Sequence, residues 1–167
     1  MWLCGCGFRD AVAHIANELG MTCQPVHHDI VAEVAWRKKT SAESLRKFGA
    51  LAAKRGDVDV CRVPMYDADF NAVGWFDMSP AVPEFDKGKM TAGSKHGLFA
   101  TRKAEPGDRL AVVEGCKDAS ALEAFGIAAV GLPTNKLDVM LASFFRGCHI
   151  TIVPDRDRAG KEGAQLT

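Results

Sequence analysis

Short apolar runs alternate with helical patterns in the C-terminal half of the chain. The runs span residues 110–113, 127–130 and 150–153, and each has the length of a buried strand. The segments between them repeat apolar residues every three or four positions and end at Gly126 and Gly147. Their apolar positions are Ala119, Leu122 and Phe125 in the first and Leu137, Met140, Leu141 and Phe144 in the second. Strands that are apolar throughout and alternate with helices are typical of a mostly parallel sheet flanked by helices.

The N-terminal half has a different pattern. Residues 8–19 show helical spacing, whereas residues 30–36 are ambiguous between strand and helix. A hydroxyl cap and an acidic first turn predict a helix from residue 40 to about residue 53. Further on, two strands (residues 58–67 and 72–78) with a turn between them predict a β-hairpin, followed by a polar, Pro-rich loop. We therefore expect a small α+β subdomain before the α/β portion.

Acidic residues follow two of the predicted parallel strands. Glu114 ends the first strand, and Asp155 and Asp157 come just after the third. The carboxyl ends of parallel strands meet at the edge where such sheets bind ligands. Carboxylates gathered there repel one another unless a cation neutralises them, and hard oxygen ligands favour Mg²⁺ or Mn²⁺. For any one of these acids the alternative is an ordinary polar residue at the start of a loop.

The composition is that of a globular protein and does not indicate a particular ligand. The chain has 167 residues, 47% of them hydrophobic, and its 21 basic and 21 acidic residues give zero net charge. Global charge therefore does not indicate nucleic-acid binding. The segment from residue 36 to residue 55 is locally basic. Its basic residues form either a helix face exposed to solvent or a face that contacts phosphates. No apolar run approaches the roughly 18 residues that span a bilayer, so we expect a cytoplasmic protein without a membrane partner.

Six cysteines are scattered along the chain. In a cytoplasmic protein they indicate free thiols or a metal site rather than disulfides. Cys4 and Cys6 are candidate Zn²⁺ ligands, but a structural zinc site needs four. Cys116 and Cys148 are expected to be small packing residues.

The order of motifs resembles the Toprim domain, which bacterial-type primases share with topoisomerases, some nucleases and recombination mediators. The motifs are Glu114-Gly115-x-x-Asp118-Ala119, then Gly131-Leu132-Pro133, then Asp155-x-Asp157-x-Ala159-Gly160. The last motif is most similar to that of the primase branch. The segment around Cys4 and Cys6 resembles the second half of a primase zinc ribbon. The resemblance implies a chain truncated at both ends, with a zinc-ribbon remnant (1–29), a primase-type subdomain (30–104) and an incomplete Toprim domain (105–167).

The resemblance also implies functional residues. Glu114, Asp155 and Asp157 would be catalytic and would bind Mg²⁺. Arg62, Lys89 and Lys95 match positions that line a basic track for template and nucleotide in that family, although Asp77 stands near a position where the family usually has an arginine. Lys117, on the first predicted helix after Glu114, would support the same site.

The function that these expectations favour is template-directed synthesis of short RNA primers. The implied partners are single-stranded DNA, ribonucleoside triphosphates and a replicative helicase. Two alternatives remain open at this point. The same carboxylates would also serve a Toprim-type nuclease or topoisomerase-like enzyme, and a non-catalytic, primase-derived fragment would bind DNA without performing chemistry.

Overall fold

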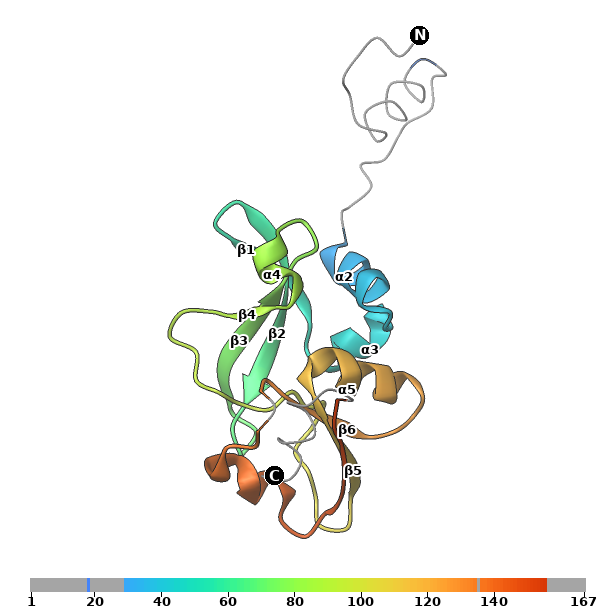
Figure 1. Cartoon of the computed structure of the whole chain (residues 1–167), viewed down its shortest axis with the longest axis vertical. Helices are drawn as coiled ribbons and strands as arrows, with labels where there is room; N and C mark the ends of the chain where they lie inside the picture. Colours follow the sequence, from blue (N-terminus) through green and yellow to red (C-terminus); the bar gives the residue numbers. More distant parts are fainter. Residues whose placement is uncertain (1–17, 19–28, 135, 156–167) are drawn as a thin grey trace.

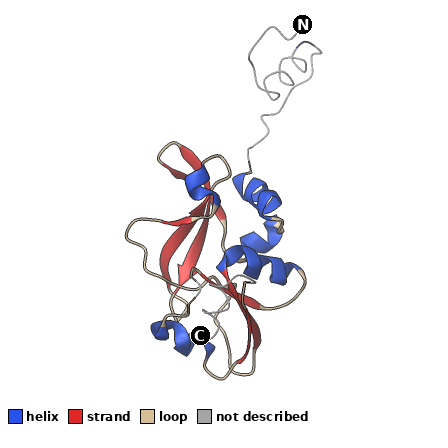
Figure 2. Ribbon diagram, viewed as in Figure 1, coloured by secondary structure: helices blue, strands red, loops and turns tan. Residues whose placement is uncertain are grey.

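Two β-sheets form the framework of the part of the chain that the structure describes (Figures 1 and 2). The computed structural model describes residue 18 and residues 29–134 and 136–155. The first sheet is antiparallel, with the order β1-β2-β3-β4, and consists of β1 (Leu51–Arg55), β2 (Val58–Tyr66), β3 (Ala72–Met78) and β4 (Lys89–Met90). The second is parallel, with the order β6-β5-β7, and consists of β5 (Arg109–Glu114), β6 (Ala129–Leu132) and β7 (His149–Val153). This arrangement confirms the predicted α/β class.

Within the described residues, helices contact both sheets (Figure 2). They are α2 (Ile30–Lys38), α3 (Ala42–Lys47), α4 (Pro83–Asp86), α5 (Gly115–Ala124) and the 3₁₀ helix η1 (Val139–Phe145). Helix α2 contacts β1 and β2, and α3 contacts α5 of the parallel unit. Within the described residues, every helix is too short or too polar to cross a lipid bilayer.

Strand β5 is buried on both of its faces. Its side chains alternate, so that Ala111 and Val113 belong to the hydrophobic cluster shared with α2, α3 and β2. Leu110 and Val112 belong to a second cluster on the opposite face, which includes Phe144 of η1. This two-sided burial explains why the strand is apolar throughout until it reaches Glu114.

The segment around Leu98 and Phe99 joins the two sheets. The Leu98 N–H donates to the Tyr66 carbonyl on β2 at 2.7 Å, and Phe99 exchanges two 2.9 Å backbone hydrogen bonds with Gly131 on β6. Both side chains are fully buried. The carboxyl edge of the parallel sheet is therefore held next to the antiparallel sheet.

The prediction of one helix from residue 40 to about residue 53 is wrong. Helix α3 ends at Lys47, and Gly49 adopts a left-handed backbone with φ of 80°. The N–H of Gly49 donates to the Arg46 carbonyl at 2.9 Å, which closes the last turn. The chain then enters β1, so Lys54 lies on a strand rather than on the basic helix face.

Several smaller expectations are settled by the same structure. The ambiguous segment at residues 30–36 is helical, and the hairpin of β2 and β3 is confirmed. The Pro-rich loop contains the short helix α4. The expectation that Phe125 faces the sheet is wrong, because this side chain is 83% exposed after the helix ends. Met140 is also exposed, because η1 is a 3₁₀ helix, in which side chains three residues apart share a face.

Candidate functional site

A cavity of about 420 Å³ opens at the carboxyl edge of the parallel sheet. Glu114 and Asp155 both line it, together with Asp118 of α5. The strand register explains why the first two meet. Val113 of β5 pairs with Val153 of β7, so Glu114 at the end of β5 and Asp155 just after β7 lie at the same edge. The expectation that acids from separate strands lie at one rim therefore agrees with the positions of Glu114 and Asp155.

Two glycines shape this edge. Gly115 follows Glu114 with φ of 80°, a conformation that L-residues other than glycine adopt only with strain, and α5 begins there. Gly131 on β6 lies against it, and a Cβ atom on Gly131 would be 2.5 Å from the Gly115 carbonyl oxygen. The tight turn allows α5 to start directly beneath the cavity with Lys117 and Asp118 in its first turn.

The cavity also has a cationic side. Lys38, Lys87 and Lys117 line it, from α2, from the end of α4 and from α5 respectively. The Lys117 ammonium lies 3.2 Å from a carboxylate oxygen of Asp118. Acids and lysines therefore line the same cavity, and two of the three lysines, Lys38 and Lys87, come from outside the parallel unit. Such a mixed lining suits a ligand that carries phosphates together with a metal ion.

The donor set fits Mg²⁺. Carboxylates are hard oxygen ligands, and Mg²⁺ needs only one or two of them because it retains waters and binds substrate phosphates. Among the described residues, His, Cys, Asp and Glu form no group of three that could hold a metal ion. Asp157, the third acid of the predicted set, lies outside the described residues. Glu114 and Asp155 are the acids from the predicted set that line this cavity.

The predicted basic residues lie in different places. Lys117 lines the cavity, but Arg62, Lys89 and Lys95 do not. Arg62 forms a bidentate ion pair with the fully buried Asp77, with distances of 2.7 Å from Nε to Oδ1 and 2.9 Å from Nη2 to Oδ2. This hydrogen bonding raises the pKa of the Arg62 guanidinium. Lys89 pairs with Glu84, and Lys95 is exposed.

Lys38 and Lys87 are the lining residues that the sequence analysis missed. Lys87 stands directly before Gly88, but nothing in the sequence distinguishes it from Lys89 two positions later. Lys38 follows the segment at residues 30–36, whose secondary structure was ambiguous, and it reaches the cavity only because α2 packs on the antiparallel sheet. Both lysines reach the site through tertiary packing, and no local sequence pattern marks either of them.

The thiols lie in different surroundings. Cys116 lines the cavity wall but is only 2% exposed, and its Sγ lies 3.9 Å from the Met78 sulfur. Burial raises the pKa of Cys116 to about 12, and burial raises the pKa of Cys61 to about 12 as well. Cys116 is therefore a packing residue, as expected. Cys4 and Cys6, the candidate zinc ligands, lie outside the described residues.

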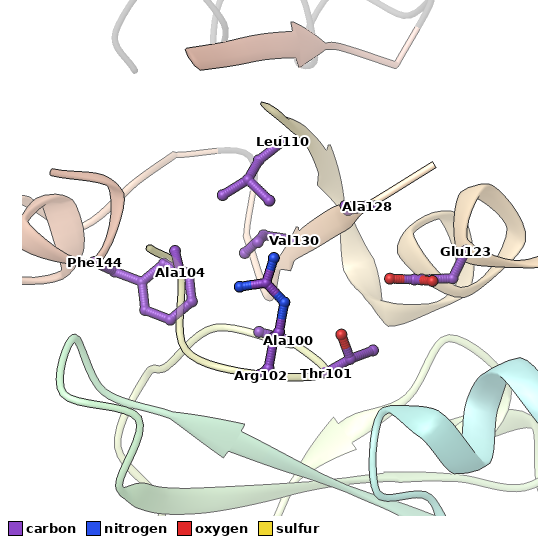
Figure 3. A pocket seen from close by; sticks show the side chains of 10 residues that line it. Ala100, Thr101, Arg102, Ala104, Leu110, Glu123, Ala128, Val130 and Phe144 are labelled. Carbon is purple, nitrogen blue, oxygen red and sulfur yellow. The ribbon is translucent and has the colours of Figure 1, made fainter. Parts of the chain in front are cut away.

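Two other hollows lie near the parallel sheet. The one in Figure 3 has a volume of about 30 Å³, and the Arg102 side chain points into it between Phe144 and Glu123. That volume suits a single water rather than a substrate. A second hollow of about 320 Å³ shares Pro133 with the main cavity and is lined by His96, Thr134 and Lys136 among others. Lys136 and Thr134 follow β6 at the same carboxyl edge.

Comparison with solved structures shows which fold this is. No family model and no curated protein sequence matches the chain. The DnaG primase catalytic domain bound to single-stranded DNA is similar, with a TM-score of 0.61, 18% identity, and coverage of 94% of this chain and 65% of that one. A DNA primase domain from Pseudomonas aeruginosa has a TM-score of 0.59 at 17% identity, covering 94% and 64% of the two chains. The primase fragment of the bacteriophage T7 primase-helicase protein has a TM-score of 0.56 at 20% identity, covering 78% and 57%.

These matches confirm the resemblance to primases at the level of the fold. The chain has the fold of a DNA primase catalytic core, and it spans 57% to 65% of the length of the three proteins named above.

Proposed function

We propose that this chain is a primase-like nucleotidyltransferase that extends a ribonucleotide primer on single-stranded DNA. The observation that carries the proposal is the cavity that Glu114 and Asp155 line together with Lys87 and Lys117. The fold agrees with it, since the similar structures are primase catalytic cores. One of those was solved with single-stranded DNA, and another comes from a primase-helicase protein. A DNA template and a replicative helicase are therefore the partners we propose.

The proposed reaction is an attack by the primer's terminal hydroxyl on the α-phosphorus of a nucleoside triphosphate. A new P–O bond forms, the bond between the α- and β-phosphates breaks, and pyrophosphate leaves with its electron pair. Bound Mg²⁺ would supply Lewis-acid stabilisation of the charge that develops on the phosphoryl oxygens. Glu114 and Asp155 would hold the ion, with Asp157 as a further proposed ligand.

The chain's own residues would position the reactants. Glu114 would bind a metal ion or accept the proton of the attacking hydroxyl, and the carboxylate suits either role. Lys117 and Lys87, which both line the cavity, would contact the phosphates. Lys89 and Lys95 remain proposed template contacts outside the cavity. Arg62 would contact nucleic acid only through the part of its guanidinium that Asp77 leaves exposed.

A strand-passage mechanism has less support. Such a reaction would need a tyrosine nucleophile, and Tyr66 is the one tyrosine of the sequence. Its ring stacks on Phe70 with a centroid distance of 4.2 Å, and it does not line the cavity. Burial raises the pKa of the Tyr66 hydroxyl, which disfavours the reactive phenolate.

The proposal is tested by removing charge from the carboxylates without changing their shape. Glu114→Gln and Asp155→Asn should each reduce primer synthesis by roughly 10²-fold or more, the usual range for loss of a group that acts on the reacting atoms. Synthesis is measured as incorporation of labelled ribonucleotides on single-stranded DNA with Mg²⁺. Glu43→Gln and Asp57→Asn make the same changes at exposed positions outside the cavity and should leave incorporation unchanged. Undiminished synthesis by both cavity variants would refute the proposal.

A further inference from the structure

Lys38 joins the cavity to a part of the chain that carries none of the predicted catalytic residues. It is the last residue of α2, and its side chain is 21% exposed. Lys38 lines the cavity, and its ammonium lies 3.1 Å from Oδ1 of Asp86, the last residue of α4. The side chain therefore has two neighbours that can compete for its charge, namely the carboxylate of Asp86 and whatever anion enters the cavity.

Asp86 is surrounded by positive charge. Arg37 approaches it with Nε at 4.0 Å from Oδ1, and Lys87 follows it directly in the chain. Together with the hydrogen bond from Lys38, these cations hold the pKa of the Asp86 carboxyl below its usual range, so the group stays charged at neutral pH. One carboxylate thus faces three cations, and two of them, Lys38 and Lys87, line the cavity.

The Lys38–Asp86 pair is poorly suited to a purely structural role. The Asp86 side chain is 45% exposed, and ion pairs this accessible to solvent contribute between nothing and about 1 kcal/mol. Lysine has a long flexible stem and carries a compact charge, so its ammonium can exchange one anionic partner for another over a short distance. A triphosphate, with several negative charges, would compete well with a single carboxylate.

We propose that Lys38 binds the phosphates of the incoming nucleotide and that Asp86 competes with them for its ammonium. This inference rests on the proposed function and adds a residue from α2 to the substrate contacts. In the absence of ligand, the Lys38 ammonium is paired with Asp86; when phosphate enters the cavity, the ammonium moves to it. Asp86 therefore weakens phosphate binding, because the Lys38–Asp86 ion pair must break before the ammonium can contact a phosphate.

Substitutions of Lys38 and of Asp86 are predicted to change the affinity for phosphate in opposite directions, and this difference tests the inference. Binding of inorganic tripolyphosphate in the presence of Mg²⁺ is measured by calorimetry on the whole chain. Lys38→Gln should weaken binding roughly tenfold, the equivalent of one charge-assisted hydrogen bond. Asp86→Asn should tighten binding several-fold, a gain that misfolding cannot produce. In the Lys38→Gln background, Asp86→Asn should have little further effect, because the ammonium for which it competes is gone.

Arg37→Gln is the matched control. Arg37 also faces Asp86, but it does not line the cavity, so its loss should change the affinity by no more than about twofold. Weaker or unchanged binding in Asp86→Asn, or unchanged binding in Lys38→Gln, would overturn the inference. If the wild-type chain makes primers but fails to bind tripolyphosphate, the inference is wrong and the proposed function stands. Conversely, if the variants show the expected changes in tripolyphosphate binding but the wild-type chain makes no primers, the inference about Lys38 holds and the proposed function is wrong.

Discussion

At the scale of single residues, the buried carboxylate of Asp77 is paired with arginines from the two neighbouring strands β1 and β2. It is fully buried on β3, directly opposite Arg62 on β2. Arg62 satisfies both of its oxygens, and Nη1 of Arg55 lies 3.5 Å from Oδ2. A buried charge is tolerated only when it is paired and hydrogen-bonded. The ion pair therefore fixes how β1, β2 and β3 align.

We predict that Asp77→Asn lowers the free energy of unfolding by about 3 kcal/mol, because it leaves a mostly buried guanidinium without its counter-charge. Urea denaturation followed by circular dichroism measures the change. Asp59→Asn is the control, since it removes a carboxylate from the exposed pair with Lys54, and its effect should stay below about 1 kcal/mol. If Arg62 served chiefly as a template contact, Asp77→Asn would instead leave stability almost unchanged and strengthen DNA binding.

The positions of the acids at the cavity could be predicted from the sequence, whereas the positions of the lysines that line it could not. Glu114 and Asp155 are recognisable because each follows an apolar strand, a position with a fixed geometric meaning in parallel sheets. A lysine in a loop has no such marker. Arg62 matched a family motif, yet its partner Asp77 is fifteen residues away and meets it only through the hairpin register.

At the scale of elements, the end of α2 determines where Lys38 points. The chain reverses at Lys39, which adopts a left-handed backbone with φ of 56° although it is not a glycine. Its N–H donates to the carbonyls of Ala35 and Trp36, which closes the last turn. Glycine is the residue that this position favours, since a Cβ atom makes the conformation less stable.

We therefore predict that Lys39→Gly raises the free energy of unfolding by about 0.5–1 kcal/mol. The Lys39 side chain is exposed, so its removal sacrifices no packing. Thermal and chemical denaturation would both detect the gain. Lys47→Gly, in the last turn of α3, is the comparison, because a glycine in ordinary helical conformation should lower stability by a similar amount. A loss of stability in Lys39→Gly would mean that the lysine side chain itself supports the turn.

Elements were predictable where periodicity was strong and unpredictable where a turn interrupted it. The β2–β3 hairpin and strands β5 and β7 follow from alternation and apolar runs. The helix predicted across residues 40–53 failed because Leu51 continues a helical spacing through Gly49, and only the left-handed glycine reveals the break. The two-residue connection from β1 to β2, at Gly56 and Asp57, was missed for the same reason.

At the scale of the whole molecule, one hydrophobic cluster spans both halves of the chain. It contains Cys61 and Val63 of β2, Phe99 between the sheets, and Val113 and Cys116 of the parallel unit. A boundary between residues 104 and 105 was expected from the family resemblance and stays a prediction. Composition and periodicity alone indicated the α/β class, but the pairing of two different sheets around Phe99 could be expected only from that resemblance, because long-range contacts leave no local pattern.

The shared cluster has a consequence for stability at alkaline pH. The folded chain raises the pKa of Cys61 and Cys116 to about 12, from an ordinary value of 9.0, because burial disfavours the thiolate. Above pH 9 the unfolded chain loses these protons while the folded chain keeps them. The unfolded state then binds fewer protons, so the free energy of unfolding falls as pH rises. Each thiol should contribute a loss of about 1.4 kcal/mol between pH 8 and pH 10.

We predict that Cys116→Ala makes this alkaline fall shallower by roughly that amount, whatever its effect on stability at pH 8. Urea denaturation at several pH values between 8 and 10 measures the slope, and other groups that titrate in this range cancel when variant and wild type are compared. Cys148→Ala is the control: its thiol is only half-buried and lies outside the shared cluster, so most of the fall should remain. An unchanged slope in Cys116→Ala would show that this thiol ionises as easily in the folded chain as in water, and hence that the cluster joining the two sheets admits solvent.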